Sequence, residues 1–200
     1  MTTDGTGVYH AVWGLWLLWV ISWWLAARWS ARTLKTTRPG ERVLEVLLTL
    51  SGSYGLMLGG MPTLSPHIYP LSVVVAWTLA GLVACGFALC WWARLHLGRM
   101  WSMNITLKQD HQIIDTGPYA LVRHPIYTGL LLTAWATAAT DNSGLGMAGA
   151  GLMTLGIYMK ARREEQLLNA ELAAAYDTYR RRVPMLLPRL RRMPPHGESG

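Results

Sequence analysis

Long apolar runs separated by polar connections are the feature that most constrains how this 200-residue chain can fold. Five runs carry at most one charged residue each: residues 10–29, 43–60, 71–93, 126–140 and 145–159. The whole chain is 52% hydrophobic and 14% charged, whereas about a quarter of the residues in an ordinary soluble domain are charged. The pattern predicts an all-α integral membrane protein with about five transmembrane helices.

The last two runs are short and lie on either side of a polar turn. At 1.5 Å per residue, the run at 126–140 reaches about 22 Å, less than a hydrocarbon core of about 30 Å. We therefore predict a tight helical hairpin, packed through small residues at four-residue spacing such as Ala134 and Ala150. The expected organisation is three transmembrane helices at 1–93 and a second region at 94–200, which holds a polar loop at 94–124, the hairpin at 125–160, and an amphipathic C-terminal helix and tail at 161–200.

The basic residues follow the apolar runs in a regular way. Lys and Arg fall in the connections at 30–42, 94–124 and 160–200 and at the adjoining ends of the runs. By the positive-inside rule this places the N-terminus outside and the C-terminus in the cytoplasm. The net charge of +7 is therefore interpreted as a topology signal, and we expect no nucleic acid partner.

The segment Arg123-His124-Pro125 stands where the long polar loop meets the fourth apolar run. Proline has no N–H group and fixes φ, so Pro125 predicts the first turn of a helix, and Gly117-Pro118 before it predicts a turn. An ionisable pair at a membrane border indicates a functional site. Free N–H groups at a helix start, beside a cation, suit a carboxylate or phosphate. The alternative, of about equal weight, is a positive-inside anchor.

A pair of acidic residues, Glu164 and Glu165, directly follows the fifth apolar run. Glu165 shares the apolar face of the next helix with Leu168 and Leu172, so its carboxylate needs a partner. Arg123, His124 or a bound cation are the candidates, and a solvated Arg-Glu pair is the alternative. The two cysteines lack the paired spacing of a zinc site, and we predict no metal.

Several short motifs occur in a fixed order along the chain. They are LGRMWS at 97–102, HQII at 111–114, GPY at 117–119 and RHPIYTG at 123–129, then Glu164, Glu165, Tyr176, Tyr179 and Pro188. This ordered set resembles the isoprenylcysteine carboxyl methyltransferase family and the related phospholipid N-methyltransferases, over about residues 70–190. The first two apolar runs match that family only in being spans.

The resemblance implies a membrane methyltransferase that uses S-adenosylmethionine, releases S-adenosylhomocysteine and has its active site on the cytoplasmic side. The chain has no GxGxxG after a strand-like run, so a Rossmann domain is not indicated. Carried over by position, the resemblance assigns catalysis to Arg123, Lys160 and Glu165, and cofactor binding to His111, Gln112, Ile113, Ile114, Tyr119, Arg123, His124, Pro125, Ile126, Tyr127 and Glu164. Lys160 replaces an arginine of the family, and so loses the bidentate fork that suits a carboxylate acceptor.

The acceptor implied by the family is a lipophilic molecule that reaches the site from the membrane lipid. A prenylated thioether carboxylate is the first expectation, as in isoprenylcysteine carboxyl O-methylation; a phospholipid amine and a small apolar thiol or acid are alternatives. Sterol reductases, which use NADPH, look similar around Arg-His-Pro but follow the proline with Asn. Ile126 and the Glu164-Glu165 pair favour the methyltransferase over a reductase or a membrane scaffold without enzymatic activity.

Overall fold

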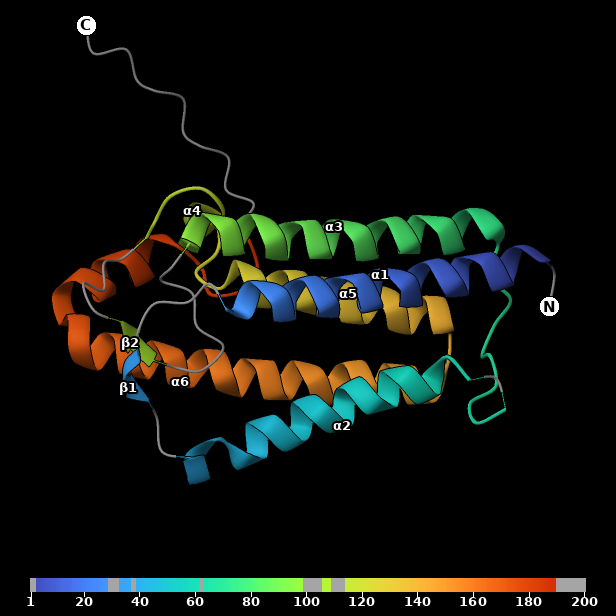
Figure 1. Ribbon diagram of the computed structural model, residues 1–200, viewed down its shortest axis with the longest axis horizontal. Coiled ribbons are helices and arrows are strands. Elements are labelled where there is room, and N and C mark those ends of the chain that lie inside the picture. The colour runs from blue at the N-terminus through green and yellow to red at the C-terminus, as the bar shows by residue number, and fades with distance from the viewer. Residues whose placement is uncertain are drawn as a thin grey trace, which may run out of the picture.

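Each of the five apolar runs forms a helix in the computed structural model (Figure 1). The structure describes residues 3–28, 33–36, 39–61, 63–98, 106–108 and 114–189. The helices are α1 (Thr3–Ala27), α2 (Val43–Gly59), α3 (Val73–Leu97), the one-turn α4 (Pro118–Leu121), α5 (Pro125–Asp141) and α6 (Gly144–Arg182), with a short 3-10 helix η1 (Pro39–Arg42) before α2.

Two of these helices are long and apolar enough to cross a membrane, at Thr6–Ala27 and Val73–Leu97. Only 11% and 28% of their most apolar windows are buried inside the protein. A core helix of a soluble protein is mostly buried, so apolar faces left this exposed indicate lipid contact. This exposure supports an integral membrane protein. The helices α2 and α5 have 17 residues each, a length of about 25 Å, and a crossing by all five helices is not established.

The helices pack as two close pairs, α2 with α6 and α3 with α5. A methyl group placed on Gly52 of α2 would lie 2.5 Å from the backbone nitrogen of Met153 in α6. One placed on Gly86 of α3 would lie 2.7 Å from the carbonyl oxygen of Gly129 in α5. Both pairs therefore meet backbone to backbone through glycine, as small residues allow in membranes. Ala134 and Ala150 share a buried cluster between α5 and α6, as predicted, but the closest approach of α6 is to α2.

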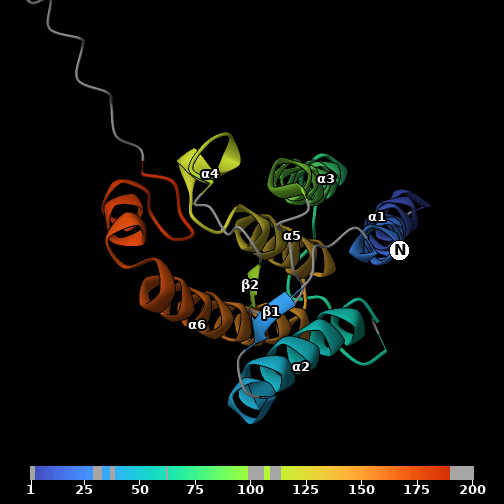
Figure 2. The same cartoon turned by 60° about the vertical axis from the view of Figure 1, so that its left-hand side comes forward.

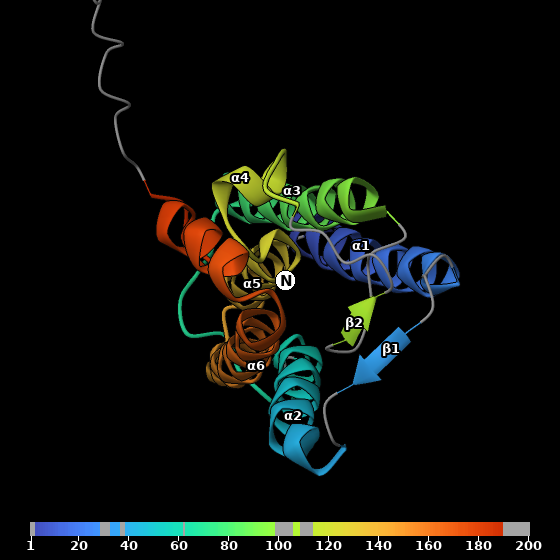
Figure 3. The ribbon, with the colours of Figure 1, turned by 90° about the vertical axis from the view of Figure 1, so that its left-hand side faces the viewer.

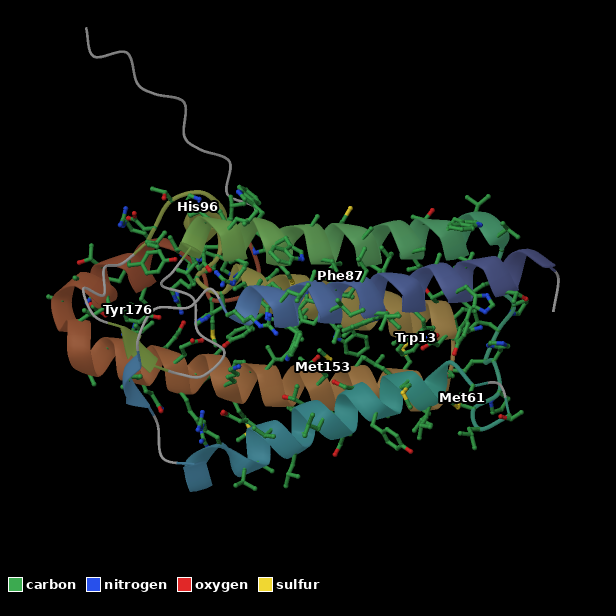
Figure 4. The ribbon with its side chains drawn as sticks, viewed as in Figure 1. Trp13, Met61, Phe87, His96, Met153 and Tyr176 are labelled. Atoms are coloured by element: carbon green, nitrogen blue, oxygen red, sulfur yellow. The ribbon has the colours of Figure 1, made fainter. Side chains whose placement is uncertain are left out.

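Three tryptophans of α1, namely Trp16, Trp19 and Trp23, pack against aromatic side chains of α3. The rings of Trp16 and Trp19 lie 5.0 Å and 5.2 Å from the ring of Phe87, and Trp19 stacks on Trp23 at 5.0 Å. Figure 4 shows Phe87 in the middle of the bundle, where α1 and α3 lie together. These three rings therefore serve to pack α1 against α3.

The fifth apolar run and the predicted C-terminal helix are one continuous helix, α6, of 39 residues. No glycine or proline occurs between residues 157 and 182, and the sequence there is rich in Ala, Leu, Glu and Arg, which favour helix. The helix changes direction towards its C-terminal end, which comes to lie near α4 (Figure 2). Tyr176 and Tyr179 are buried there and pack with Leu168 and Leu172, so the predicted apolar face is confirmed.

The fold is all-α as predicted, apart from one small antiparallel sheet that joins two of the loops and that the sequence analysis did not predict. Strand β1 (Thr33–Thr36) pairs with β2 (Thr106–Lys108), with Lys35 opposite Leu107. The pairing connects the loops that follow α1 and α3, at the end of the bundle that faces the viewer in Figure 3. The charge pattern predicts these two loops on the same side of the membrane, and the structure places them at the same end of the bundle.

Candidate functional site

The turn before α5 is built around Gly117, which has a φ of +56°. A methyl group at this position would lie 2.7 Å from the ring of His96 at the end of α3. His96 in turn lies 2.8 Å from the hydroxyl of Thr116 and stacks on the ring of Tyr119. Glycine therefore suits this position for two reasons: it adopts a positive φ without strain, and it leaves room for the ring of His96. Figure 4 places His96 and Tyr176 at the same end of the bundle.

Helix α5 begins at Pro125, as predicted, and brings Arg123 and His124 against α6. Arg123 donates through Nε to Oε1 of Glu165 at 2.7 Å, and its Nη2 lies 2.5 Å from the same oxygen. His124 Nε2 lies 3.3 Å from that oxygen as well. The side chains of Arg123 and Glu165 are only 8% and 7% exposed. The prediction that Glu165 is buried and needs a partner is confirmed, and of the candidate partners both Arg123 and His124 contact it.

The pKa of Glu165 reflects two opposing effects. Burial raises it, because a carboxylate is poorly solvated there, but the hydrogen bonds and charges of His124 and Arg123 outweigh burial and hold the pKa below its ordinary value of 4.5. Glu165 is thus an ionised carboxylate held in place by Arg123 and His124. Burial raises the pKa of Tyr176 above its ordinary value, so its hydroxyl stays neutral beside this pair.

The remaining donors of this corner hold the segment at residues 183–186, which we name the C-terminal clamp. Arg123 Nη1 donates to the carbonyl oxygens of Val183 at 2.5 Å and Arg180 at 3.1 Å. The backbone N–H groups of Arg123 and His124 donate to the carbonyls of Pro184 and Met185, at 2.8 Å and 3.1 Å. The sequence predicted free N–H groups at this helix start, suited to an anion. These two N–H groups are instead occupied by the clamp, because the chain folds back after α6.

Glu164, one residue away, has a different surrounding. Its Oε2 accepts a hydrogen bond from the hydroxyl of Tyr127 at 2.9 Å and lies 3.6 Å from Nδ1 of His124. The rings of His124 and Tyr127 stack at 5.4 Å with an interplanar angle of 13°. The side chain of Glu164 is 26% exposed, so this carboxylate is open to a ligand. Lys160 places its Nζ over the Tyr127 ring, 5.6 Å from the ring centre.

A salt bridge that the sequence analysis missed adjoins this group. Arg163 Nε lies 3.6 Å from Oε2 of Glu45, in the first turn of α2. Glu45 is 3% exposed. The signal in the sequence was a single carboxylate inside an apolar run, which needs a partner when it is buried. The partner is 118 positions further along the chain, so local spacing does not identify it.

The other residues assigned by resemblance lie in different places. Tyr119 is buried, its carbonyl accepts from the hydroxyl of Tyr179 at 2.7 Å, and Ile114 is half-buried. Ile126 packs with the cluster of Trp23 and Cys90, towards α1 and α3 and away from Glu164. Pro125 is fully buried at the start of α5. His111, Gln112 and Ile113 lie outside the described residues.

A small cleft of about 90 Å³ lies beside Glu165 on the C-terminal part of α6. It is lined by Arg162, Glu165, Gln166, Asn169 and Arg180. The site as a whole has one paired and nearly buried carboxylate, Glu165, which the cleft adjoins, and one more exposed carboxylate, Glu164.

Comparison with known proteins connects this site to a family. A family model described as the isoprenylcysteine carboxyl methyltransferase (ICMT) family matches residues 79–170. Methanethiol S-methyltransferase 2 of Bradyrhizobium diazoefficiens is 49% identical over 72 residues, which are 36% of this chain and 27% of the relative. A methanethiol S-methyltransferase of Crocosphaera subtropica is 39% identical over 70 residues, which cover 35% of this chain and 27% of that protein.

A relative of a different description also matches. The cobalt-zinc-cadmium resistance protein CzcN of Cupriavidus metallidurans is 30% identical over 95 residues, 47% of this chain and 44% of that protein. The chain thus spans between about a quarter and just under half of the length of these curated relatives. The family match at 79–170 includes most of α3, all of α5 and the part of α6 that carries Lys160, Glu164 and Glu165. The resemblance predicted from the motifs is confirmed, and the chain is related to the isoprenylcysteine carboxyl methyltransferase family through the segment that builds its candidate site.

Proposed function

We propose that this protein is a membrane methyltransferase that transfers a methyl group from S-adenosylmethionine to a small apolar thiol. The observation that carries the proposal is the accessible carboxylate of Glu164, held by Tyr127 and His124 within the family-matched segment. Two of the relatives described above are methanethiol S-methyltransferases, which favours a small thiol over the other acceptors.

The residues present fit the cofactor by their chemistry. S-adenosylmethionine carries a sulfonium, an ammonium and ribose hydroxyls, and a partly exposed carboxylate such as Glu164 can bind an ammonium or hydroxyl groups. The stacked rings of His124 and Tyr127 offer an aromatic surface, which suits adenine or a sulfonium cation. We propose that Tyr119, Ile114 and residues 111–113 line the adenosine. When bound, the cofactor supplies an activated methyl group.

Arg123 has a supporting role in this proposal. Its guanidinium donors already bind Glu165 and the carbonyls of the clamp, so we propose it as a positioning residue rather than as the ligand of the cofactor carboxylate. By joining α5 to α6 it fixes the distance between Tyr127 and Glu164. Positioning of well-oriented reactants can lower the activation free energy by about 7–11 kcal/mol. This is the main contribution to catalysis that we expect from the site.

Lys160 bears on the identity of the acceptor. A lysine is a single point charge, whereas arginine offers a planar fork that matches a carboxylate. A prenylcysteine carboxylate therefore has a weaker anchor here than in a site with arginine, while a single cation suits the negative charge that develops on a thiol sulfur. A phospholipid amine gains nothing from a cation at this position.

The test is methyl transfer from labelled S-adenosylmethionine by the purified protein in lipid nanodiscs. Three acceptors are compared: a short alkylthiol, N-acetyl-S-farnesylcysteine and phosphatidylethanolamine. Labelling of the thiol is expected. Labelling of the farnesyl acid or the lipid alone would replace the proposed acceptor, and a rise in thermal stability with NADPH alone would favour a reductase.

Glu164→Gln is the matching variant. A ligand at a hundredfold excess over its dissociation constant stabilises the native state by about 2.7 kcal/mol, and this gain with S-adenosylhomocysteine should vanish in the variant. Asp177→Asn, on the same helix and paired with Arg180 and Arg181, is the control and should keep the full gain. An unchanged gain in Glu164→Gln contradicts the assignment of this carboxylate.

A further inference from the structure

Helix α2 brings a third carboxylate, Glu45, to the candidate site from outside the family-matched segment. Its first turn is pressed against α6 at Gly156, where a methyl group would lie 2.4 Å from Thr49 Oγ1 and 2.8 Å from the carbonyl oxygen of Glu45. The hydroxyl of Thr49 also donates to that carbonyl at 2.7 Å. The position of Glu45 along α6 is therefore fixed by backbone contact.

The face of α6 that Glu45 meets carries the cations of the site. Gly156, Lys160 and Arg163 are spaced four and three residues apart, so they lie on one side of the helix. Glu45 Oε2 is 3.6 Å from Nε of Arg163. Burial raises the pKa of Glu45 above its ordinary value, and the charges of Arg163, Lys160 and Arg42 offset only part of this rise. Because Lys160 also lies over the Tyr127 ring, Glu45 belongs to the same group of side chains.

Two buried polar atoms in this group lack a hydrogen bond among the described residues. One is Oε2 of Glu45, an acceptor, and the other is Nη1 of Arg163, a donor. Leaving buried groups of this kind unpaired is unfavourable. A ligand atom that both donates and accepts, such as the S–H of a thiol, satisfies both at once. Oε2 of Glu164 and Oε1 of Glu165 already accept hydrogen bonds from Tyr127 and Arg123. Oε2 of Glu45 has Arg163 as an ion-pair partner but accepts no hydrogen bond among the described residues.

We propose that Glu45 is a catalytic residue, the proton acceptor for the thiol, with Arg163 and Lys160 holding the sulfur; this rests on the proposed function. The S–H bond breaks, its proton moves to Oε2 of Glu45, and the sulfur keeps the electron pair with which it bonds to the transferred methyl group. The resulting carboxylic acid then returns its proton to water. The bond between the methyl group and the sulfonium of the cofactor would break as the new S–CH₃ bond forms, and its electron pair would stay on the departing S-adenosylhomocysteine. The step therefore needs no other reactant.

The test compares two acceptors that differ in their need for a base. A short alkylthiol is protonated at neutral pH, whereas a nitro-substituted thiophenol is already ionised. A general base typically contributes about 10²–10⁴-fold, so Glu45→Gln should lower kcat for the alkylthiol by about that factor and leave the thiophenol rate nearly unchanged. Glu45→Asp should restore part of the alkylthiol rate. An equal loss with both acceptors, or no loss with either, overturns the role of Glu45.

Thr49→Val is the matched control, because it removes the hydrogen bond to the Glu45 carbonyl while keeping the carboxylate. It should lower the two rates equally if it lowers them at all. If Glu45→Gln does not fold, the pH dependence of the wild-type protein is the test. The alkylthiol rate should fall at acidic pH as Glu45 becomes protonated, whereas the thiophenol rate should show no such fall. Parallel pH profiles for the two acceptors overturn the role. If the wild-type protein methylates neither thiol, the proposed function itself is overturned. If the wild type is active but Glu45→Gln affects both acceptors equally, only the role of Glu45 is overturned.

Discussion

Glu164 and Glu165 are neighbours in sequence, but their surroundings differ completely. Glu165 is buried, accepts from Arg123 and lies against His124, and so joins α5 to α6. Glu164 is partly exposed and accepts from Tyr127. Successive residues on a helix point about 100° apart, so one carboxylate meets the packed corner and the other meets the accessible part of the site. The comparison shows that two adjacent carboxylates on one helix can differ, one being buried in an ion pair and the other partly exposed.

The largest expected effect comes from breaking the ion pair between Arg123 and Glu165. Arg123→Ala leaves Glu165 as a buried charge without its main partner, which should cost about 3–5 kcal/mol of stability. Unfolding in a mild denaturing detergent measures it. Arg123→Ala combined with Glu165→Gln should recover a large part of the loss, since no unpaired charge remains. If the double variant is as unstable as the single one, the ion pair is not what holds this corner.

Acid should weaken the ion pair between Arg123 and Glu165 within a pH range that the pKa of Glu165 sets. The pKa of Glu165 is lower in the folded protein than its ordinary value of 4.5, so the pair contributes its full stability above that pH and loses it as the pH falls towards the folded pKa. Thermal melts of wild-type protein should therefore drop below pH 4.5. In the Arg123→Ala, Glu165→Gln protein this part of the acid loss should be absent; an identical loss would mean that other carboxylates cause it.

The smallest expected effect concerns Lys160, which lies beside Tyr127 and the partly exposed Glu164. Lys160→Arg keeps the charge beside Tyr127 but adds a planar fork, which should favour carboxylate over thiol acceptors. We expect the ratio of the two rates to shift by up to about tenfold, equivalent to about 1.4 kcal/mol. Competition between N-acetyl-S-farnesylcysteine and an alkylthiol measures the ratio. A constant ratio would show that Lys160 does not contact the acceptor.

Features with a local signal could be predicted from the sequence. Pro125 predicted the start of α5, and the spacing of Glu165, Leu168 and Leu172 predicted a buried carboxylate in need of Arg123 or His124. The motif set predicted the family. These predictions succeed because proline geometry, helical periodicity and the cost of burying a charge all act within a few residues of the chain.

Features that depend on distant contacts could not be predicted. The pairing of β1 with β2 joins segments about 70 residues apart, and the short strands carry no alternating pattern. The salt bridge between Glu45 and Arg163 and the clamp on α5 likewise join separate parts of the chain. The residues after α6 were expected to form an irregular tail. Residues 183–186 have no regular structure, but their carbonyls accept hydrogen bonds from Arg123, His124 and Thr128 at the start of α5.

The clamp has a consequence for how this region can change during evolution. It holds Arg123 and His124 through main-chain oxygens, which every amino acid provides. Substitutions at Met185 or Leu186 therefore leave these hydrogen bonds available, whereas inserting or deleting one residue between Tyr179 and Leu186 shifts every carbonyl out of register. The segment should accordingly tolerate drift in side-chain identity and resist changes in length.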